Sequence, residues 1–417
     1  MESYSAGVNE FIQTQWLPIE VKISPLAADP WTIEDSLSIV QLFAYVGLQT
    51  MQTDSENFVL HAINLGNNAT ISELHRLFPD QVPPTLDEEM IQAIQSLREF
   101  PQIVSKDKFL GVSMLSEQIG SNNWVVSGAH TESGKPLQAN DPHLQVDRLP
   151  AIFYEFIYKQ GEEFTSGVSA PGFPGVIMGR TQHISFGLTY GVADQVDYFI
   201  EDIKDGEVLR PEGKRVAIRH RMEDIHQKDG ETIHYSVFET EDGCVLELTN
   251  QYNVVTDIPD GKYVSSKWAW DHMTSNRLPD MGHKQNYRTV DDIADALKLN
   301  PVSCNYLIAD TQGNIAYQQS GLVPKRNPKY PIMLPLPAWW EDAVWNTIRS
   351  ADDGLKVKNP ESGFIATANN DVTLLDSTFD INCISFHMGP YRAQRANDIL
   401  RKQIESGQKV NIELMKE

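Results

Sequence analysis

Apolar residues recur at helical spacing through the first hundred residues of the chain, which predicts a helical segment there. The clearest helix follows Thr32, which stands three residues before Asp35, the spacing of a capping box. Two later helices are predicted from the same capping signature and from one apolar face. The residues concerned are Thr70 with Glu73, Thr85 with Glu88, and the apolar set Met90, Ile91, Ile94 and Leu97.

Beyond residue 123 the pattern changes to short runs rich in β-branched and aromatic residues, which predict strands. These runs cover residues 123–126, 151–158, 184–188, 197–200, 233–238, 263–270, 306–309 and 314–318. The segment from Asp310 to Asn314 predicts a hairpin turn between the last two strands. Helical spacing returns at 290–299 and 392–406. Helices first and then mostly strands indicate an α+β protein.

Composition narrows the classes of function. The chain has 417 residues, of which 41% are hydrophobic, as expected for a folded protein of one large domain or two or three smaller ones. Its net charge of −23 argues against nucleic acid and against an anionic membrane surface as partners, because both attract clustered Lys and Arg. The same excess of carboxylates suits a protein that holds a hard cation.

Cysteines and the N-terminus exclude other classes. Three cysteines (Cys244, Cys304 and Cys383) with no CxxC pair exclude a zinc ribbon and a disulfide framework, while one disulfide stays open. No apolar run of about 18 residues is present, so no membrane span is predicted. The first residues lack the features of a signal peptide and resemble the middle of a helix. We therefore expect the chain to begin inside a larger protein.

Most familiar hydrolase motifs are missing from this sequence. GxSxG, HExxH, the P-loop and GxGxxG are all absent, and we attribute the SxxK match at Ser406 to chance. A Gly–Ser bond at Gly120–Ser121 stands where the helical pattern gives way to strands. Attack of this serine on its preceding carbonyl would cut the chain and leave an α-amine with a pKa near 8, which could act as the base for its own hydroxyl. The alternative is a serine that caps a turn.

Several motifs together resemble the penicillin acylase family of N-terminal nucleophile hydrolases. They are Ser121-Asn-Asn-Trp, Asn140-Asp-Pro-His, Pro171-Gly-Phe-Pro-Gly, Asp194-Gln-Val-Asp, Asn369-Asn370 and Tyr391-Arg-Ala-Gln-Arg395. They follow one another in the family's order and spacing, and the resemblance extends from Gly7 to the last helix. Taken one by one, these residues would be ordinary loop, strand and surface positions. Their ordered agreement is what favours the family.

The resemblance implies a role for each matching residue. Ser121 matches the N-terminal nucleophile, and Gly120–Ser121 matches the self-cleaved bond. His143 matches a residue whose backbone N–H contributes to the oxyanion hole, and its ring could also hold the α-amine. Tyr190 matches the second backbone donor, and Asn369 matches the side-chain amide donor. Arg392 matches an arginine that orders the site.

A structural calcium ion is also implied by the resemblance. Glu56, Asp194, the carbonyl of Val196 and Asp197 match its ligands, and these are the oxygen donors that calcium prefers. The alternative for the two aspartates is a solvated turn. Asp380 could be a further ligand.

An acyl pocket is implied at three aliphatic positions, namely Leu144, Met178 and Leu188. Aliphatic side chains at these matching positions predict an apolar pocket with little aromatic stacking. Packing of the core is the alternative explanation for the same residues.

The resemblance implies the four-layer αββα sandwich of N-terminal nucleophile hydrolases, here incomplete at both ends. Residues 1–90 would be the helical part of the small chain, 91–120 a spacer that ends at the cleavage site, and 121–417 the first part of the large chain. The family precursor is longer at both ends, so this chain covers about its middle half. Exposed sheet edges are therefore expected, together with an αβ heterodimer after self-cleavage.

The implied activity is hydrolysis of a linear amide through an acyl-enzyme on the serine. The substrate would be a small acyl amide such as a penicillin, or alternatively an N-acyl homoserine lactone. A catalytically silent fragment that binds calcium or a partner is the alternative from another class. No organic cofactor is expected, and the family suggests a location outside the cytoplasm.

Overall fold

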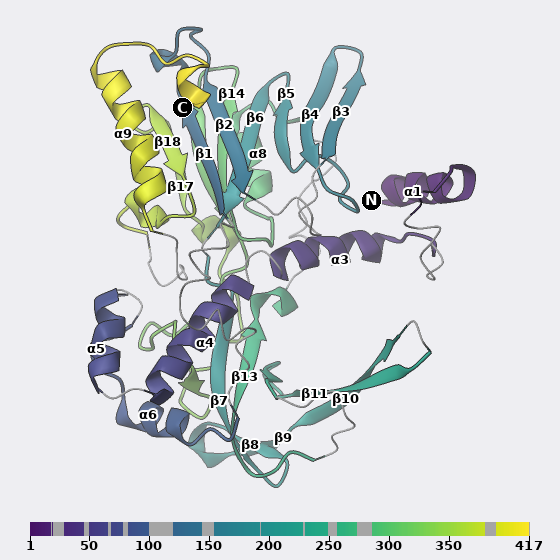
Figure 1. The fold of residues 1–417 in the computed structure, drawn as a ribbon, viewed down its shortest axis with the longest axis vertical. Helices are drawn as coiled ribbons and strands as arrows, with labels where there is room; N and C mark the ends of the chain where they lie inside the picture. Colours follow the sequence, from purple (N-terminus) through teal and green to yellow (C-terminus); the bar gives the residue numbers. More distant parts are fainter. Residues whose placement is uncertain are drawn as a thin grey trace.

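The computed structural model describes residues 1–17, 19, 29–45, 50–65, 68–77, 82–99, 120–143, 154–191, 193–227, 230–248, 257–272, 286–379 and 389–416. Leu144 and Asp380, two of the predicted site residues, lie outside these ranges, as does Cys383. The described chain forms two bodies, one above the other in Figure 1, with helices α3 and α4 close to the level at which they meet.

The N-terminal segment is helical, as the sequence predicts. Its helices are α1 (Glu2–Thr14), α3 (Ile33–Ala44), α4 (Thr50–Leu65), α5 (Asn68–Leu77) and α6 (Glu88–Gln95). The capping box at Thr32 is confirmed, because Asp35 N–H donates to Thr32 Oγ1 and Thr32 N–H donates to the Asp35 carboxylate.

Two other predicted helix starts are wrong. Thr70 lies inside α5, and the cap of α6 is Asp87, whose carboxylate accepts from Glu89 N–H, and not Thr85. Helix α6 continues to Gln95, so the first residues of the predicted spacer are helical. Beyond it, Arg98 N–H donates to the carbonyl of Lys262, and this contact ties the segment to the lower sheet. The remainder of the predicted spacer, from residue 100 to 119, is outside the described residues.

The upper body contains two sheets that face each other. The smaller has the order β18 (Phe364–Thr367), β1 (Gly120–Val126) and β2 (Leu137–His143). The larger has the order β17 (Lys356–Lys358), β15 (Ile315–Ser320), β14 (Cys304–Asp310), β6 (Ile184–Tyr190), β5 (Met178–Thr181), β4 (Glu163–Ser169) and β3 (Tyr154–Gln160). All its neighbouring strands are antiparallel. The predicted turn at Asp310 is confirmed, since Asp310 N–H bonds Asn314 O and Gly313 N–H bonds Asp310 O.

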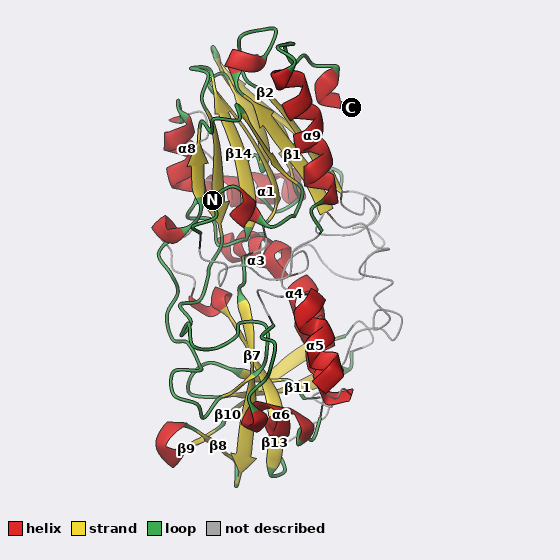
Figure 2. Cartoon of the chain, turned by 90° about the vertical axis from the view of Figure 1, so that its left-hand side faces the viewer, coloured by secondary structure: helices red, strands yellow, loops and turns green. Residues whose placement is uncertain are grey.

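One helix covers each outer side of this pair of sheets. Helix α9 (Tyr391–Glu405) packs against β18 and β1, and helix α8 (Val290–Leu297) packs against β14 and β15. Figure 2 shows the two helices on opposite sides of the strands. Both occupy the positions predicted from helical spacing, and α8 begins with a second capping box, formed by Thr289 and Asp292.

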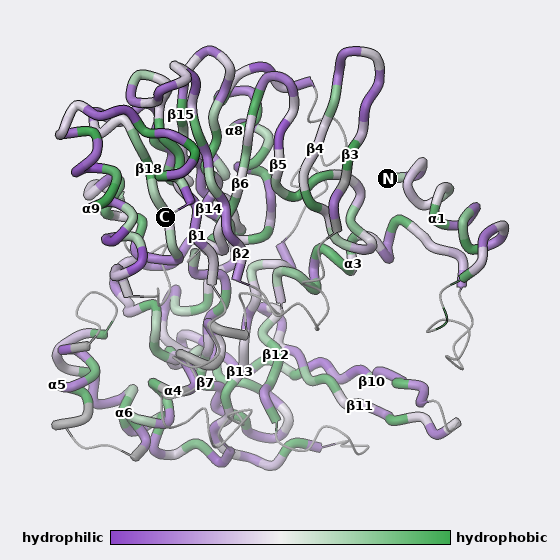
Figure 3. Tube along the Cα trace, turned by 45° about the horizontal axis from the view of Figure 1, so that its top comes forward, coloured by the Kyte–Doolittle hydropathy of each residue, from purple (hydrophilic) through white to green (hydrophobic). Residues whose placement is uncertain are grey.

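The lower body is built on a third sheet. Its order is β10 (Arg219–His226), β11 (Thr232–Glu239), β12 (Val245–Leu246), β13 (Gly261–Trp268), β7 (Val196–Lys204), β8 (Glu207–Leu209) and β9 (Arg215–Ala217), and β16 (Leu336–Pro337) pairs with β7. Helices α4 and α6 pack on it through an apolar core that includes Leu60, Ile94 and Phe199. The sequence does not predict β10, which is exposed along its whole length and largely hydrophilic (Figure 3).

Candidate active site

Strand β1 of the smaller upper sheet carries the predicted nucleophile near its start. Ser121 is the second residue of β1, which β2 and β18 flank on either side. Its side chain is buried, and Ser121 Oγ lies 2.7 Å from the carbonyl oxygen of Gly120. The hydroxyl is thus held against the peptide bond that the sequence predicts it to attack.

Asn369 holds the amide of the nucleophile. Its Oδ1 accepts from Ser121 N–H at 2.7 Å, and its Nδ2 donates to the carbonyl of Tyr190 at 3.0 Å. Asn369 is almost fully buried and has a φ of 60°, a left-handed conformation that Asn adopts more readily than most residues. One side chain therefore connects strand β1 to the end of strand β6.

Arg392 approaches the same group from the first turn of α9. Its Nη1 donates to the carbonyl of Ser121 and to Asn122 Oδ1, both at 2.9 Å, and its Nη2 donates to Asn369 Oδ1 at 3.0 Å. A guanidinium that donates several bonds at fixed angles orients its partners more rigidly than an ammonium would. The structure thus brings Ser121, Asn369 and Arg392 together, as predicted.

Gly120 fits this environment because it lacks a side chain. A Cβ at this position would lie 3.1 Å from both Arg392 Nη2 and Asn369 Oδ1, which is tighter than ordinary contact. The residue before the nucleophile is therefore limited to glycine, or to a residue for which these two side chains move.

His143 and Tyr190 lie near this group with different contacts. His143 pairs with Gly120 across strands β1 and β2, so its backbone is close to the predicted cleavage site. Its ring Nε2 lies 2.8 Å from Asp141 Oδ2 and 3.2 Å from Asn122 Nδ2, so the ring is directed at the neighbour of Ser121. Burial raises the pKa of the Tyr190 phenol, so this group stays protonated at neutral pH.

Two of the three predicted pocket residues lie in one apolar cluster. Met178 and Leu188 are buried there with Val40 of α3 and with Trp270. Residues of α8 belong to the same cluster, so these side chains also pack the core. Their contact with an acyl chain stays a prediction.

The predicted calcium ligands come together where α4 meets the start of β7. Glu56, Asp194 and Asp197 are all buried, and burial raises the pKa of each carboxyl group, that of Asp194 to about 7. Arg326 Nη2 lies 2.6 Å from Asp194 Oδ1, and Arg326 Nε lies 2.9 Å from Asp197 Oδ2. The guanidinium of Arg326 thus bonds two of the three carboxyl groups directly.

The amide of Gln52 lies among the same oxygens. Its Nε2 donates to Glu56 Oε1 at 3.0 Å, to the carbonyl of Val196 at 3.1 Å and to Asp194 Oδ1. Within the described residues, no group of three or more His, Cys, Asp or Glu side chains is already arranged as a metal site.

This donor set nevertheless fits a divalent cation by its charge and chemistry. Asp194 Oδ2 is buried and has no hydrogen-bond partner among the described residues, and three buried carboxyl groups gather at a site where Arg326 bonds two of them. Uncompensated buried charge is costly, and oxygen donors are those that calcium binds.

Sequence reasoning missed several residues of these two groups. Arg326 and Gln52 carry no local motif, and both contact Asp194, which lies more than a hundred positions away from each in the chain. Asn122 and Asn140 stand inside motifs that the resemblance uses, but no role was assigned to them. The presence of an asparagine in each of these two motifs was the sequence signal that could have identified Asn122 and Asn140.

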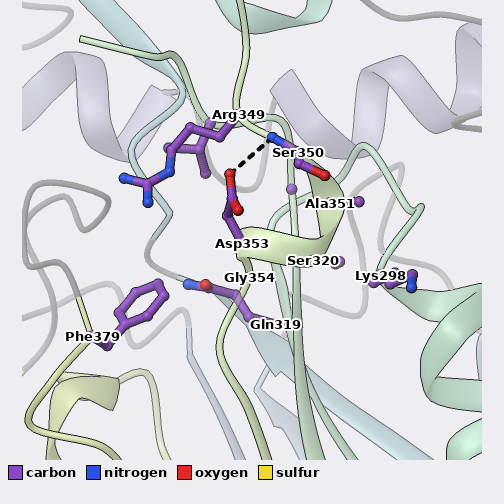
Figure 4. A pocket seen from close by; sticks show the side chains of 11 residues that line it. Lys298, Gln319, Ser320, Arg349, Ser350, Ala351, Asp353, Gly354 and Phe379 are labelled. Atoms are coloured by element: carbon purple, nitrogen blue, oxygen red, sulfur yellow. Dashed lines mark hydrogen bonds between the residues drawn. The ribbon is translucent and has the colours of Figure 1, made fainter. Parts of the chain in front are cut away.

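A separate hollow lies away from the predicted catalytic residues. It is a small, open hollow at the end of β15, lined among others by Lys298, Gln319, Arg349 and Phe379 (Figure 4). The Gln319 amide is buried, and its Nε2 has no hydrogen-bond partner among the described residues. None of the residues predicted to be catalytic lines this pocket.

The described helices include none that is long and apolar enough to cross a membrane. The profile of the penicillin amidase family matches residues 1–417. Among curated proteins, acyl-homoserine lactone acylase QuiP of Pseudomonas aeruginosa is 24% identical over 88% of this chain and 44% of its own length. Penicillin acylase 2 proenzyme of a Pseudomonas species is 25% identical over 95% of this chain and 50% of its own.

Penicillin G acylase of Escherichia coli is 29% identical over 60% of this chain and 29% of its own length, so the chain spans at most about half of these curated relatives. A solved structure of the thermostable penicillin G acylase from Alcaligenes faecalis superposes with a TM-score of 0.51 at 22% identity, over 60% of this chain and 44% of that one. This similarity supports a shared fold. Because the family profile matches the whole length of the chain, the chain belongs to the penicillin amidase family.

Proposed function

We propose that the protein is an amidohydrolase that forms an acyl-enzyme on Ser121 after cutting its own chain between Gly120 and Ser121. The contact of Ser121 Oγ with the Gly120 carbonyl, at 2.7 Å, is the observation that carries this proposal. Asn369 and Arg392 hold the amide and the carbonyl of Ser121, so the attacking residue is fixed on both sides.

The cut begins with attack of Ser121 Oγ on the carbonyl carbon of Gly120. The bond between that carbon and the nitrogen of Ser121 breaks, and the hydroxyl proton passes to the nitrogen, which leaves an ester. Water then hydrolyses the ester, so that Gly120 becomes a carboxylate and Ser121 regains its hydroxyl with a free α-amine. Asn369 Oδ1, which now accepts from the amide N–H, can accept from the amine in the same way.

In the processed protein the α-amine acts as the base for Ser121 Oγ, since its pKa near 8 suits this task. The oxygen attacks the substrate carbonyl, the amine of the substrate leaves with a proton, and water releases the acyl group. The Asn369 amide and the backbone N–H groups of His143 and Tyr190 would donate to the oxyanion. Such donors are effective because the negative charge of this intermediate develops in a site from which bulk water is excluded.

We infer that the upper body is the core of an αββα sandwich. Helix α9, the sheet of β1, the sheet of β6 and helix α8 are the four layers that support this view. The cut would leave a small and a large chain, and we propose that they remain together as a heterodimer. Contacts between α4 or α6 and the lower sheet would hold them after cleavage.

We propose that calcium binds at Glu56, Asp194, Asp197 and the carbonyl of Val196. The ion would supply positive charge to a buried carboxylate cluster and take no part in the reaction. It would also link α4 of the small chain to β7 of the large chain. Gln52 would have to turn away from Asp194, which its side-chain bonds permit.

A linear acyl amide is the proposed substrate class. A penicillin with an apolar acyl group and an N-acyl homoserine lactone are the two candidates, since Met178 and Leu188 lie in an apolar cluster that also holds the aromatic residues Phe186, Trp270 and Tyr306. Comparing rates for penicillin G and N-octanoyl homoserine lactone decides between them. A longer apolar pocket would favour the lactone.

Intact-mass measurement after expression tests the proposal. We expect two fragments whose masses place the cut between Gly120 and Ser121, and a single uncut chain for Ser121→Ala. A wild-type chain that stays whole and hydrolyses neither substrate, in the complete protein that carries these 417 residues, would refute the proposal. It would support instead the reading of a silent module.

A further inference from the structure

Asn140 joins the two sheets of the upper body next to the nucleophile. It lies on β2, and its Nδ2 donates to the carbonyl of Asn122 and to the carbonyl of Leu188, both at 2.9 Å. Its Oδ1 accepts from Leu188 N–H at 3.0 Å. Both protons and the oxygen of the amide are therefore used, so the side chain has one orientation.

Strand β6 is shaped to receive this side chain. A Cβ on Gly187 would lie 2.7 Å from Asn140 Oδ1, a distance that real Cβ atoms essentially never show, and 3.0 Å from the Cβ and Cγ of Asn140. Glycine at this position therefore leaves the space that Asn140 fills. The two residues form a matched pair across the interface between the sheets.

The residues that Asn140 joins stand beside the proposed reacting groups. Asn122 follows the nucleophile Ser121 directly, and Leu188 stands two positions before Tyr190. At the far end of this short segment, Asn369 links Tyr190 O to Ser121 N–H. The segment of β6 from 188 to 190 is thus fixed to the nucleophile strand at both ends.

No backbone ladder could supply this alignment. Strands β1 and β6 belong to different sheets, so side chains must set the distance between them. A misplacement of about 1 Å in a catalytic group can cost about 100-fold in rate. A short, fully bonded amide is well suited to fix such a distance.

We infer that Asn140 is a positioning residue that holds the Tyr190 backbone, the proposed oxyanion donor, at its working distance from Ser121. This inference rests on the proposed function. Asn140 does not touch the reacting atoms. It acts on them only by holding strand β6 in place.

Gln138 provides a matched control on the same strand. It lies two residues earlier on the same face, accepts from Ser185 Oγ at 2.7 Å and donates to the carbonyl of Leu307 at 2.8 Å. It joins the same two sheets through an amide but farther from Ser121. A change at Gln138 therefore tests whether any weakened contact between the sheets lowers the rate.

The experiment compares Asn140→Asp with Gln138→Glu in the complete protein. Each change keeps the shape and removes the amide donors. Hydrolysis of phenylacetyl and octanoyl p-nitroanilides is measured per mole of self-cleaved protein, below the melting temperature of every variant. We expect Asn140→Asp to lower kcat about 100-fold with little change in KM, and Gln138→Glu to leave kcat within a few-fold.

Two further readouts separate positioning from folding. The ratio of Asn140→Asp to wild-type kcat should rise as the pH falls, because a protonated carboxyl regains one donor. Gly187→Ala, which crowds the amide without removing it, should also lower kcat, and it keeps the test open if Asn140→Asp fails to fold.

Equal kcat for Asn140→Asp and wild type, or an equal loss for Gln138→Glu, overturns the inference while the proposed function stands. A wild-type protein that neither cuts itself nor hydrolyses either probe overturns both. These outcomes are distinguished by the wild-type assay alone.

Discussion

The amide nitrogen of Asn369 is the group whose role can be isolated most sharply. Asn369→Asp replaces Nδ2 by oxygen and keeps Oδ1, which accepts from Ser121 N–H at 2.7 Å and from Arg392 at 3.0 Å. Aspartate also tolerates the φ of 60° at this position, whereas alanine there would add about 1–2 kcal/mol of strain. The change therefore removes one donor from an otherwise similar site.

Two effects of different size are expected from this change. Loss of the bond from Nδ2 to Tyr190 O should cost about 0.5–1.5 kcal/mol of folding free energy, offset in part by a carboxylate that faces the Arg392 guanidinium. Loss of an oxyanion donor should cost about 2.7–4 kcal/mol in the transition state, or about 100- to 1,000-fold in kcat. A carboxylate beside the developing oxyanion would add to this loss.

The assay measures kcat and KM for p-nitroanilide hydrolysis, together with the melting temperature. Asn370→Asp is the matched control, because the neighbouring Asn370 is equally buried and its amide bonds the backbone of Ala368 and Asp371. We expect kcat to fall in Asn369→Asp alone, with KM nearly unchanged. A kcat within about threefold of wild type would remove Asn369 from the oxyanion hole.

Three further predictions concern the scaffold. Calcium should raise the melting temperature and EDTA should lower it, and Asp194→Asn with Asp197→Asn should abolish the difference; a melting temperature indifferent to both reagents would contradict the proposed ion. Arg210→Ala should lower the free energy of unfolding by about 3–5 kcal/mol, because Arg210 bonds the fully buried Glu201 at 2.6 Å. The control Arg219→Ala, at an exposed ion pair, should lower it by under about 1 kcal/mol, and equal losses in urea-induced unfolding would refute this prediction. Burial raises the pKa of Cys304 to about 12 and also that of Cys244, so peptide mapping should find neither alkylated by iodoacetamide until the protein unfolds.

The sequence by itself determined the local elements. Capping at Thr32, the turn at Asp310 and residues 123–126 of strand β1 follow from the nearest few residues, because those residues fix φ, ψ and periodicity; the start of β1 at Gly120 was not predicted. The resemblance, which rests on short motifs, added the group of Ser121, Asn369 and Arg392. Caps at Thr70 and Thr85 were wrong because the same short signature also occurs inside or just before a helix.

Only the tertiary structure decided which distant residues meet. Asn369 is 248 positions from Ser121, and Arg326 is 132 positions from Asp194, so no periodic pattern connects either pair. Asn140 likewise finds Leu188 across two sheets that no backbone ladder joins. Such contacts depend on how the sheets stack and on the space left by residues such as Gly187, and this information exists only once the chain is folded.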